Sequence, residues 1–157
     1  MTNSSVASLL CSLGICYSVA FIGARVTTPE IPTWYASLAK PSWTPPRIAF
    51  PIVWPILYFL MALSVWMFWE APPSPARTAA LGAFGIQLAL NAIWSPIFFG
   101  RHDLRSGMIV ISLLFAAIGV TVIIGLGVDS TAALLLLPYL AWILFAAALN
   151  ARILTMN

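Results

Sequence analysis

The sequence predicts an all-α integral membrane protein, a bundle of five transmembrane helices with a long first loop rich in proline and tryptophan. Of its 157 residues, 62% are hydrophobic and only 7% are charged, whereas soluble domains carry about 25% charged residues. Five uncharged stretches reach the roughly 20 residues that cross a bilayer core as a helix. These observations indicate a single domain, residues 1–157, whose solvent is mostly lipid.

The predicted helices follow one another through separators of unequal length. They cover residues 4–24, 48–69, 78–100, 106–128 and 130–151. The first connection, residues 25–47, is long, and the others are short, so neighbouring helices are expected to run antiparallel. No basic residue precedes the first apolar stretch, which therefore reads as a transmembrane helix rather than a cleaved signal peptide.

Lysine and arginine are distributed unequally between the two sides of this topology. One side receives Arg25, Lys40, Arg47, Arg101, Arg105 and Arg152, and the other receives Arg77 alone. In a bacterial inner membrane, the positive-inside rule predicts a cytoplasmic C-terminus and first loop, and an N-terminus outside. The net charge of +3 is too small to support nucleic-acid binding.

The predicted spans contain no Asp, Glu, Lys or Arg, which argues against an ion-coupled transporter. They offer no acid, base, nucleophile or metal site either. Cys11 and Cys16 are interpreted as packing residues because their spacing suits neither a disulfide nor a metal pair. His102, in a charged loop, is expected to be solvated rather than a ligand.

Neutral polar and small residues recur on the third predicted helix. Gln87, Asn91 and Ser95 are four apart and share a face, with Trp94 beside it. They serve either as hydrogen-bonding contacts between helices or as groups that orient a ligand in an apolar pocket. Small residues at Ala79, Gly82 and Ala83 allow close helix approach, either in a homodimer or within the bundle.

Aromatic residues follow the same four-residue spacing on two other helices. Phe50, Trp54 and Tyr58 line the second helix, where prolines 51 and 55 interrupt the hydrogen-bond ladder and favour a kink. On the fifth helix, Tyr139 precedes Trp142, and Ala146 continues the face of Trp142. These rings either fill the core or line a cavity.

The motifs that carry these residues resemble the TspO/MBR family, the translocator and tryptophan-rich sensory proteins, over nearly the whole chain. They are WYxxLxKPxWxPP (residues 34–46), PxVWxxLY (51–58), QxxxNxxWSPxFF (87–99), PYxxW (138–142) and LN (149–150). The resemblance implies a dimeric five-helix receptor that binds tetrapyrroles such as protoporphyrin IX in a pocket within the bundle, beneath a first loop that acts as a lid. No obligatory cofactor is implied.

The resemblance also implies roles for individual residues. Trp54 and Trp142 match two pocket tryptophans that are associated with light-dependent porphyrin breakdown in bacterial relatives, and Asn91 matches a polar pocket residue. The predicted ligand-binding set is Trp34, Tyr35, Trp43, Phe50, Trp54, Tyr58, Gln87, Asn91, Trp94, Tyr139, Trp142 and Ala146; Trp54 and Trp142 are catalytic only if the chemistry is photochemical. The predicted dimer interface is Ala79, Gly82 and Ala83.

Four functions remain open at this stage. The leading hypothesis is a porphyrin receptor or sensor in tetrapyrrole homeostasis or stress response, which also takes other flat apolar ligands. The alternatives are a light-dependent porphyrin-degrading protein, a porphyrin or lipid translocator, and a scaffold with a filled core. We expect the propionates of a bound porphyrin to pair with Arg47 or Lys40. The cholesterol-recognition pattern Leu/Val-x-Tyr-x-Lys/Arg is absent, because no tyrosine lies near Arg152.

Overall fold

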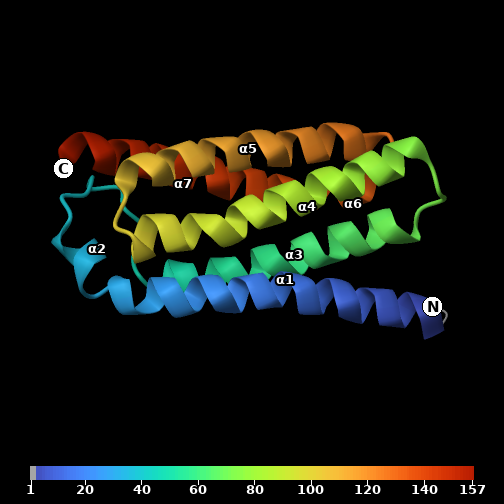
Figure 1. The fold of residues 1–157 in the computed structure, drawn as a ribbon, viewed down its shortest axis with the longest axis horizontal. Helices are drawn as coiled ribbons and strands as arrows, with labels where there is room; N and C mark the ends of the chain where they lie inside the picture. Colours follow the sequence, from blue (N-terminus) through green and yellow to red (C-terminus); the bar gives the residue numbers. More distant parts are fainter. Residues whose placement is uncertain (1–2) are drawn as a thin grey trace.

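The computed structural model describes residues 3–157 and is built from helices and turns (Figure 1). The elements are α1 (Asn3–Glu30), α2 (Trp34–Ser37), α3 (Ala49–Glu70), α4 (Pro75–Ser95), the π-helical turn η1 (Pro96–Gly100), α5 (Leu104–Leu126), α6 (Ser130–Leu134) and α7 (Leu137–Met156). Five segments are long and apolar enough to cross a membrane: Asn3–Glu30, Ala49–Glu70, Pro75–Gly100, Leu104–Leu126 and Ser130–Met156. The predicted class, an all-α bundle of five transmembrane helices, is confirmed.

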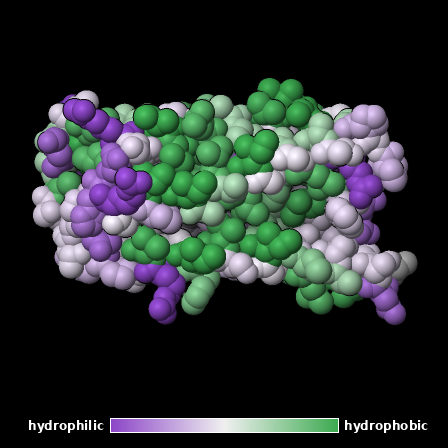
Figure 2. Space-filling view, viewed as in Figure 1, coloured by the Kyte–Doolittle hydropathy of each residue, from purple (hydrophilic) through white to green (hydrophobic). Residues whose placement is uncertain are grey.

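The outer surface of the bundle is suited to lipid. Hydrophobic side chains cover the middle of the molecule, and hydrophilic ones gather at its two ends (Figure 2). Large apolar side chains point outward in this band, among them Ile123, which is 72% exposed, and Phe21, which is 64% exposed. An outward-facing apolar surface of this extent is stable only in a bilayer, so the protein is a multi-pass integral membrane protein.

Three helices, α4, α5 and α6, begin after a residue whose side chain satisfies free backbone N–H groups. The Ser74 hydroxyl accepts a hydrogen bond from the Arg77 amide at the start of α4. The Asp103 carboxylate accepts from the amides of Arg105 and Ser106 at the start of α5, and Asp129 caps α6 in the same way. These caps stabilise the start of the helix that follows each short connection.

The helix boundaries differ most from the sequence-based ones at α1 and in the predicted fifth helix, which also runs to Met156, past the predicted end at residue 151. Helix α1 continues to Glu30, past the predicted end at residue 24, so Arg25 lies on a helix and the first connection shortens to residues 31–48. The predicted fifth helix divides at residues 135–136 into α6 and α7. Pro138 lies in the first turn of α7, a position that suits a residue without an N–H group.

The spans pack as neighbouring antiparallel pairs. Helix α4 packs on α5, α1 on α3, and α5 on α7 (Figure 1). The main buried cluster between them includes Tyr58 and Met61 of α3, Phe84 of α4, Ile111 of α5 and Tyr139 of α7. Helix α3 continues through Pro55 without a break.

A second, smaller cluster lies at the end of the bundle that carries α2 and the C-terminus. Pro96 begins the π-helical turn, in which the Arg101 amide donates to the Pro96 carbonyl at 2.9 Å. The turn places Phe98 and Phe99 in the interior, 2% and 5% exposed. Gly107 of α5 lies against this turn, where a Cβ atom would be only 2.8 Å from the Phe98 ring.

Candidate functional site

A polar triad joins three helices in the centre of the bundle. The Tyr58 hydroxyl of α3 donates to Asn91 Oδ1 of α4 at 2.6 Å, and Asn91 Nδ2 donates to the Tyr139 hydroxyl of α7. All three side chains are buried, with exposures of 4%, 6% and 0%. Asn91 therefore hydrogen-bonds to two neighbouring helices, as the interpretation of a contact between helices predicts, and its role towards a ligand stays a prediction.

Aromatic rings extend from this triad towards the first connection. The Trp54 ring lies 5.7 Å from Tyr58 and 6.4 Å from Trp142, and the Phe50 ring lies 6.2 Å from Trp142. The two contacts to Trp142 have interplanar angles of 84° and 79°, the edge-to-face geometry that aromatic pairs favour. The rings of α3 and α7 thus pack on one another between the polar triad and the first connection.

The array continues outward to the surface of the bundle. Phe145 lies 5.7 Å from Trp142 on one side and 5.7 Å from Trp43 on the other. Trp43 belongs to the first connection and is 47% exposed. Trp43, Phe145, Trp142, Trp54 and Tyr58 therefore form a continuous series of ring contacts from the surface to the buried hydroxyl of Tyr58. Phe145 was not among the predicted residues.

Gln87, one helical turn from Asn91 on α4, has a buried side-chain amide without a partner. Its side chain is 0% exposed, and neither amide atom forms a hydrogen bond within residues 3–157. Asn91, four residues further along the same helix, uses its amide in the triad. An unpaired buried amide is unfavourable by about 1–3 kcal/mol, so Gln87 keeps hydrogen-bonding capacity for a ligand or a water molecule, as do the buried side chains of Asn150 and Ser64.

Three other predicted residues gather in the smaller cluster rather than at the triad. The Trp34 ring lies 5.5 Å from Phe98 and 6.2 Å from Phe99, and Tyr35 lies 5.7 Å from Phe99. Trp94 stacks on Phe98 at 5.0 Å and donates its Nε1–H to the Gly107 carbonyl. Trp94 also packs against the main cluster, as does Ala146, so it connects the two groups of predicted residues.

The two cations proposed for propionate binding differ in their surroundings. Lys40 Nζ donates to the carbonyls of Tyr35, Leu38 and Ala36 at 2.6, 2.9 and 3.3 Å, and so closes the C-terminal end of α2. Burial, followed by the charge of Arg47, lowers the pKa of Lys40. The Arg47 side chain is exposed and pairs with no group among residues 3–157. Of these two cations, Arg47 is thus the one whose side chain has no partner within the described residues.

His102, which the sequence suggested was solvated, has two partners. Its Nε2 lies 2.9 Å from Glu30 Oε2 at the end of α1, and its ring stacks on Trp34 with centroids 4.4 Å apart and planes 9° from parallel. The backbone of His102 has a φ of 54°, in the left-handed region, which turns the chain sharply between η1 and α5. No local pattern could pair residues that lie 72 positions apart.

The small residues predicted for a dimer interface lie on the outer side of α4. Ala79 and Gly82 are exposed, and Ala83 is half-buried. A Cβ atom added at Gly82 would meet nothing within 4 Å. This face is therefore not used for packing inside the bundle, and its use in a dimer stays a prediction.

Comparison with known proteins agrees with the motifs. The sequence profile of the TspO/MBR family matches residues 12–156. The chain is 38% identical to the tryptophan-rich protein TspO of Archaeoglobus fulgidus over 154 residues, which cover 98% of this chain and 99% of that protein. It is 39% identical to the translocator protein of Bos taurus over 147 residues, 92% of this chain and 84% of that protein. It is also 34% identical to the tryptophan-rich sensory protein of Cereibacter sphaeroides, over 99% of this chain and 94% of that protein.

Proposed function

The chain belongs to the TspO/MBR family, and from that premise we propose that it is a membrane receptor or sensor for protoporphyrin IX-like tetrapyrroles and other flat apolar molecules. Its role would lie in tetrapyrrole homeostasis or stress response. The observation that carries this proposal is the aromatic array that leads from exposed Trp43 to the buried triad of Tyr58, Asn91 and Tyr139. The ligand is the porphyrin itself, and no other cofactor is required.

The walls of the proposed pocket suit a flat π-system. Trp54 and Trp142 meet edge to face, an arrangement whose contact energy is about 0.5–1.5 kcal/mol. A macrocycle that enters between α3 and α7 would replace these ring–ring contacts with contacts to its own faces. The aromatic surfaces stay buried in this exchange, so contacts with the macrocycle largely replace the contact energy lost when the two rings separate.

The polar groups at the two ends of the array would set the orientation of the ligand. At the buried end, Gln87 has an amide without a protein partner, which suits a neutral donor or acceptor on the ligand. At the mouth, Arg47 has a free guanidinium group, whereas the ammonium of Lys40 is engaged with three carbonyls. We therefore assign propionate binding to Arg47 rather than to Lys40.

The orientation in the membrane and the oligomeric state belong to the same proposal. The end of the bundle that carries α2 and the C-terminus holds six of the seven basic residues, so it would face the cytoplasm of a bacterial cell, with the N-terminus outside. Two copies would associate through Ala79, Gly82 and Ala83, whose small side chains permit close approach of two α4 helices.

The test is a dark titration of the purified protein with protoporphyrin IX, followed by quenching of tryptophan fluorescence. We expect saturable binding that the double variant Trp54→Phe/Trp142→Phe weakens about tenfold, because both ring contacts change. Arg47→Gln should weaken binding about two- to fivefold, as expected for one exposed ion pair. Trp69→Phe is the matched control, since Trp69 is 55% exposed on the span that carries Trp54 but at its opposite end.

The same samples separate the proposal from its alternatives. Illumination of the saturated protein, with the porphyrin spectrum recorded over time, would reveal a degrading activity if the spectrum fades in the wild type and persists in the double variant. Flux into sealed vesicles would indicate a translocator. An absence of saturable binding would mean that the aromatic array is a packed core, and the proposal would then be wrong.

A further inference from the structure

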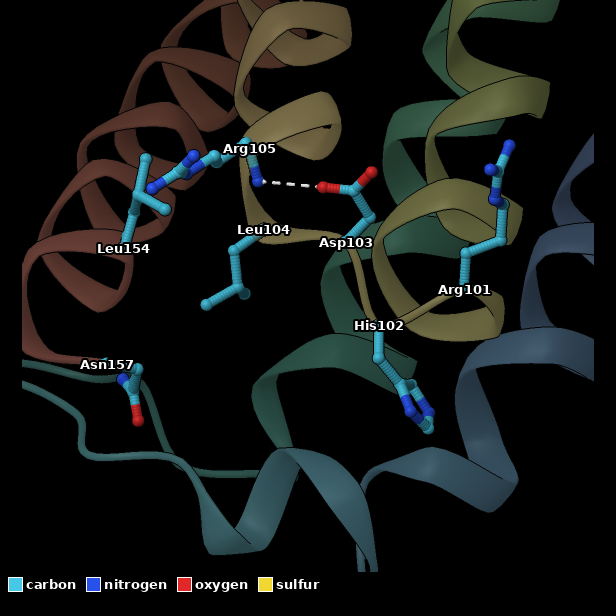
Figure 3. Close-up of a pocket in the computed structure, with 7 residues that line it drawn as sticks. All are labelled: Arg101, His102, Asp103, Leu104, Arg105, Leu154 and Asn157. Atoms are coloured by element: carbon cyan, nitrogen blue, oxygen red, sulfur yellow. Dashed lines mark hydrogen bonds between the residues drawn. The ribbon is translucent and has the colours of Figure 1, made fainter.

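Two hollows meet at the start of α5, outside the proposed porphyrin pocket. Each has a volume of about 500 Å³. The first is polar and is lined by residues of the α4–α5 loop and by Asn157 (Figure 3). The second is lined by Met108, Ile109, Ser112 and Leu113 of α5. Arg105 and Leu154 line both hollows, so together they form one continuous depression between α5 and α7.

Arg105 carries a free positive charge at the junction of the two hollows. Its side chain is exposed and extends over Leu154, while the carboxylate of Asp103 lies on the other side of the α5 backbone, where it accepts from the Arg105 amide (Figure 3). Within residues 3–157, the one ion pair joins Glu30 and His102, so no carboxylate neutralises the Arg105 guanidinium. A free guanidinium prefers the paired oxygens of a phosphate or a carboxylate.

The second hollow extends from this charge into the apolar band of the surface. Its α5 residues are spaced three or four apart and so follow one face of the helix. Ile109 and Leu113 are 62% and 54% exposed along it. Leu113 lies about 12 Å below Arg105 along the helix axis, which is within the roughly 15 Å of hydrocarbon that belongs to one leaflet.

We propose that this depression binds an anionic phospholipid, with its phosphate on Arg105 and one acyl chain in the hollow between α5 and α7. The charge on Arg105 selects the headgroup, and the apolar floor excludes a free phosphate or a soluble anion as the natural occupant. The surrounding end of the bundle holds six of the seven basic residues but only two of the four acidic ones, Glu30 and Asp103. This excess favours anionic over zwitterionic lipids.

The other polar groups near the two hollows are engaged elsewhere or point away, so we assign phosphate binding to Arg105. The Asn157 amide is occupied by the backbone of Ala39 and Ile153. The Arg101 side chain extends away from Arg105, along α4, and His102 points towards α1 and α2 (Figure 3). Hydrogen bonds from the side chain and the amide of Ser106, and then from the Arg105 amide, keep the pKa of the Asp103 carboxyl below its usual value. The Asp103 carboxyl therefore stays ionised at neutral pH. It forms no ion pair with the Arg105 guanidinium, which is left available to an anion.

The experiment compares binding of phosphatidylglycerol and phosphatidylcholine with identical acyl chains to the full-length protein in mild detergent, by native mass spectrometry. We expect the first bound lipid to be preferentially phosphatidylglycerol. Arg105→Gln should reduce that preference about fivefold, the effect of one basic residue near a membrane surface. Ser112→Trp, which fills the apolar hollow from the exposed side of α5, should weaken the first binding event for both lipids.

The matched control is Arg152→Gln, because Arg152 is exposed at the same end of the bundle and the substitution changes the net charge equally. If Arg152→Gln lowers the preference as much as Arg105→Gln does, the selectivity is a property of the whole basic end and the site is overturned. Equal binding of the two lipids by the wild type would overturn it as well. Protoporphyrin IX affinity should be unchanged in Arg105→Gln, so this test and that of the porphyrin pocket fail independently.

Discussion

Residues 31–40 of the first connection are held by specific side-chain contacts, whereas residues 41–48 are held mainly by their own stiffness. In the first half, Tyr35 is 7% exposed among the rings of Phe98 and Phe99, and Lys40 closes the end of α2. In the second half, Trp43 makes one ring contact, to Phe145, and remains 47% exposed. Prolines at 41, 45 and 46 restrict the backbone of this half, and the carbonyls of Pro41 and Pro46 accept only local hydrogen bonds, from Thr44 and Ala49.

This difference indicates which part of the connection can move to admit a ligand. The first half is attached to α1 by the Thr33 hydroxyl, which donates to the Pro29 carbonyl, to the α4–α5 loop by the stacking of Trp34 on His102, and to the C-terminus by Asn157. The second half lies next to the outer end of the aromatic array, where Trp43 meets Phe145. If the connection acts as a lid over the proposed pocket, the anchored half is its base and residues 41–48 are the part that opens.

The largest expected effect comes from Tyr35→Ala in the anchored half. Removal of a buried ring leaves a cavity against Phe98 and Phe99, and comparable substitutions lower the free energy of unfolding by about 3–5 kcal/mol. The measurement is equilibrium unfolding in SDS, followed by circular dichroism. Trp43→Ala is the comparison in the second half, and we expect a loss below about 1 kcal/mol because half of that ring is already exposed.

Equal losses for these two variants would break the comparison, because they would mean that Trp43 contributes as much packing as Tyr35 does. A small loss for Tyr35→Ala would also contradict the comparison, because Tyr35 would then not anchor the first half. The association rate of porphyrin should depend on the two residues in the opposite order. We expect Trp43→Ala to change this rate more than Tyr35→Ala does, since Trp43 lies in the segment proposed to open.

The second prediction concerns the link between the C-terminus and the first half. The Asn157 amide accepts from the Ala39 N–H and donates to the Ala39 carbonyl, both at 3.0 Å. Asn157→Ala removes both of these bonds and the one to the Ile153 carbonyl, and a typical hydrogen bond contributes about 1 kcal/mol. We expect the Ala39 amide to exchange its hydrogen about tenfold faster. Thr155→Ala is the control at the same terminus, because the Thr155 hydroxyl bonds to Arg152 and not to the first connection.

Much of the fold follows from local features of the sequence. Long uncharged stretches locate the five spans, and the aromatic spacing identifies Trp54, Tyr58 and Trp142, which do contact one another. The extension of α1 to Glu30 does not follow from the apolar pattern, because the uncharged stretch ends before Arg25. A long helix can carry a charge near its end when that end leaves the hydrocarbon, and α1, at about 42 Å, exceeds the thickness of the core.

What the sequence could not predict are the pairings that depend on neighbouring helices. Gln87 and Asn91 share a face of α4, but only Asn91 meets Tyr58 and Tyr139, so the same spacing gives one bonded amide and one free amide. His102 and Glu30 meet through the turn at η1, and Asn157 meets Ala39 across 118 positions. Such contacts are set by the packing of whole elements, which leaves no periodic signal in the chain.

The smallest expected effect sharpens the comparison within the second half. Pro46→Ala adds conformational freedom to the unfolded chain and should lower stability by about 0.4–1 kcal/mol. The Ala49 amide, which donates to the Pro46 carbonyl at 2.9 Å, reports on this half, and we expect its hydrogen exchange to accelerate about two- to fivefold. The Ser37 amide, which donates to the Thr33 carbonyl, reports on the anchored half and should be unaffected. Pro72→Ala, in the connection at the opposite end of the bundle, should leave both amides unchanged. Parallel acceleration of Ala49 and Ser37 in Pro46→Ala would show that the two halves open as one unit, and the base of the lid would then have to be sought in α1 and the α4–α5 loop.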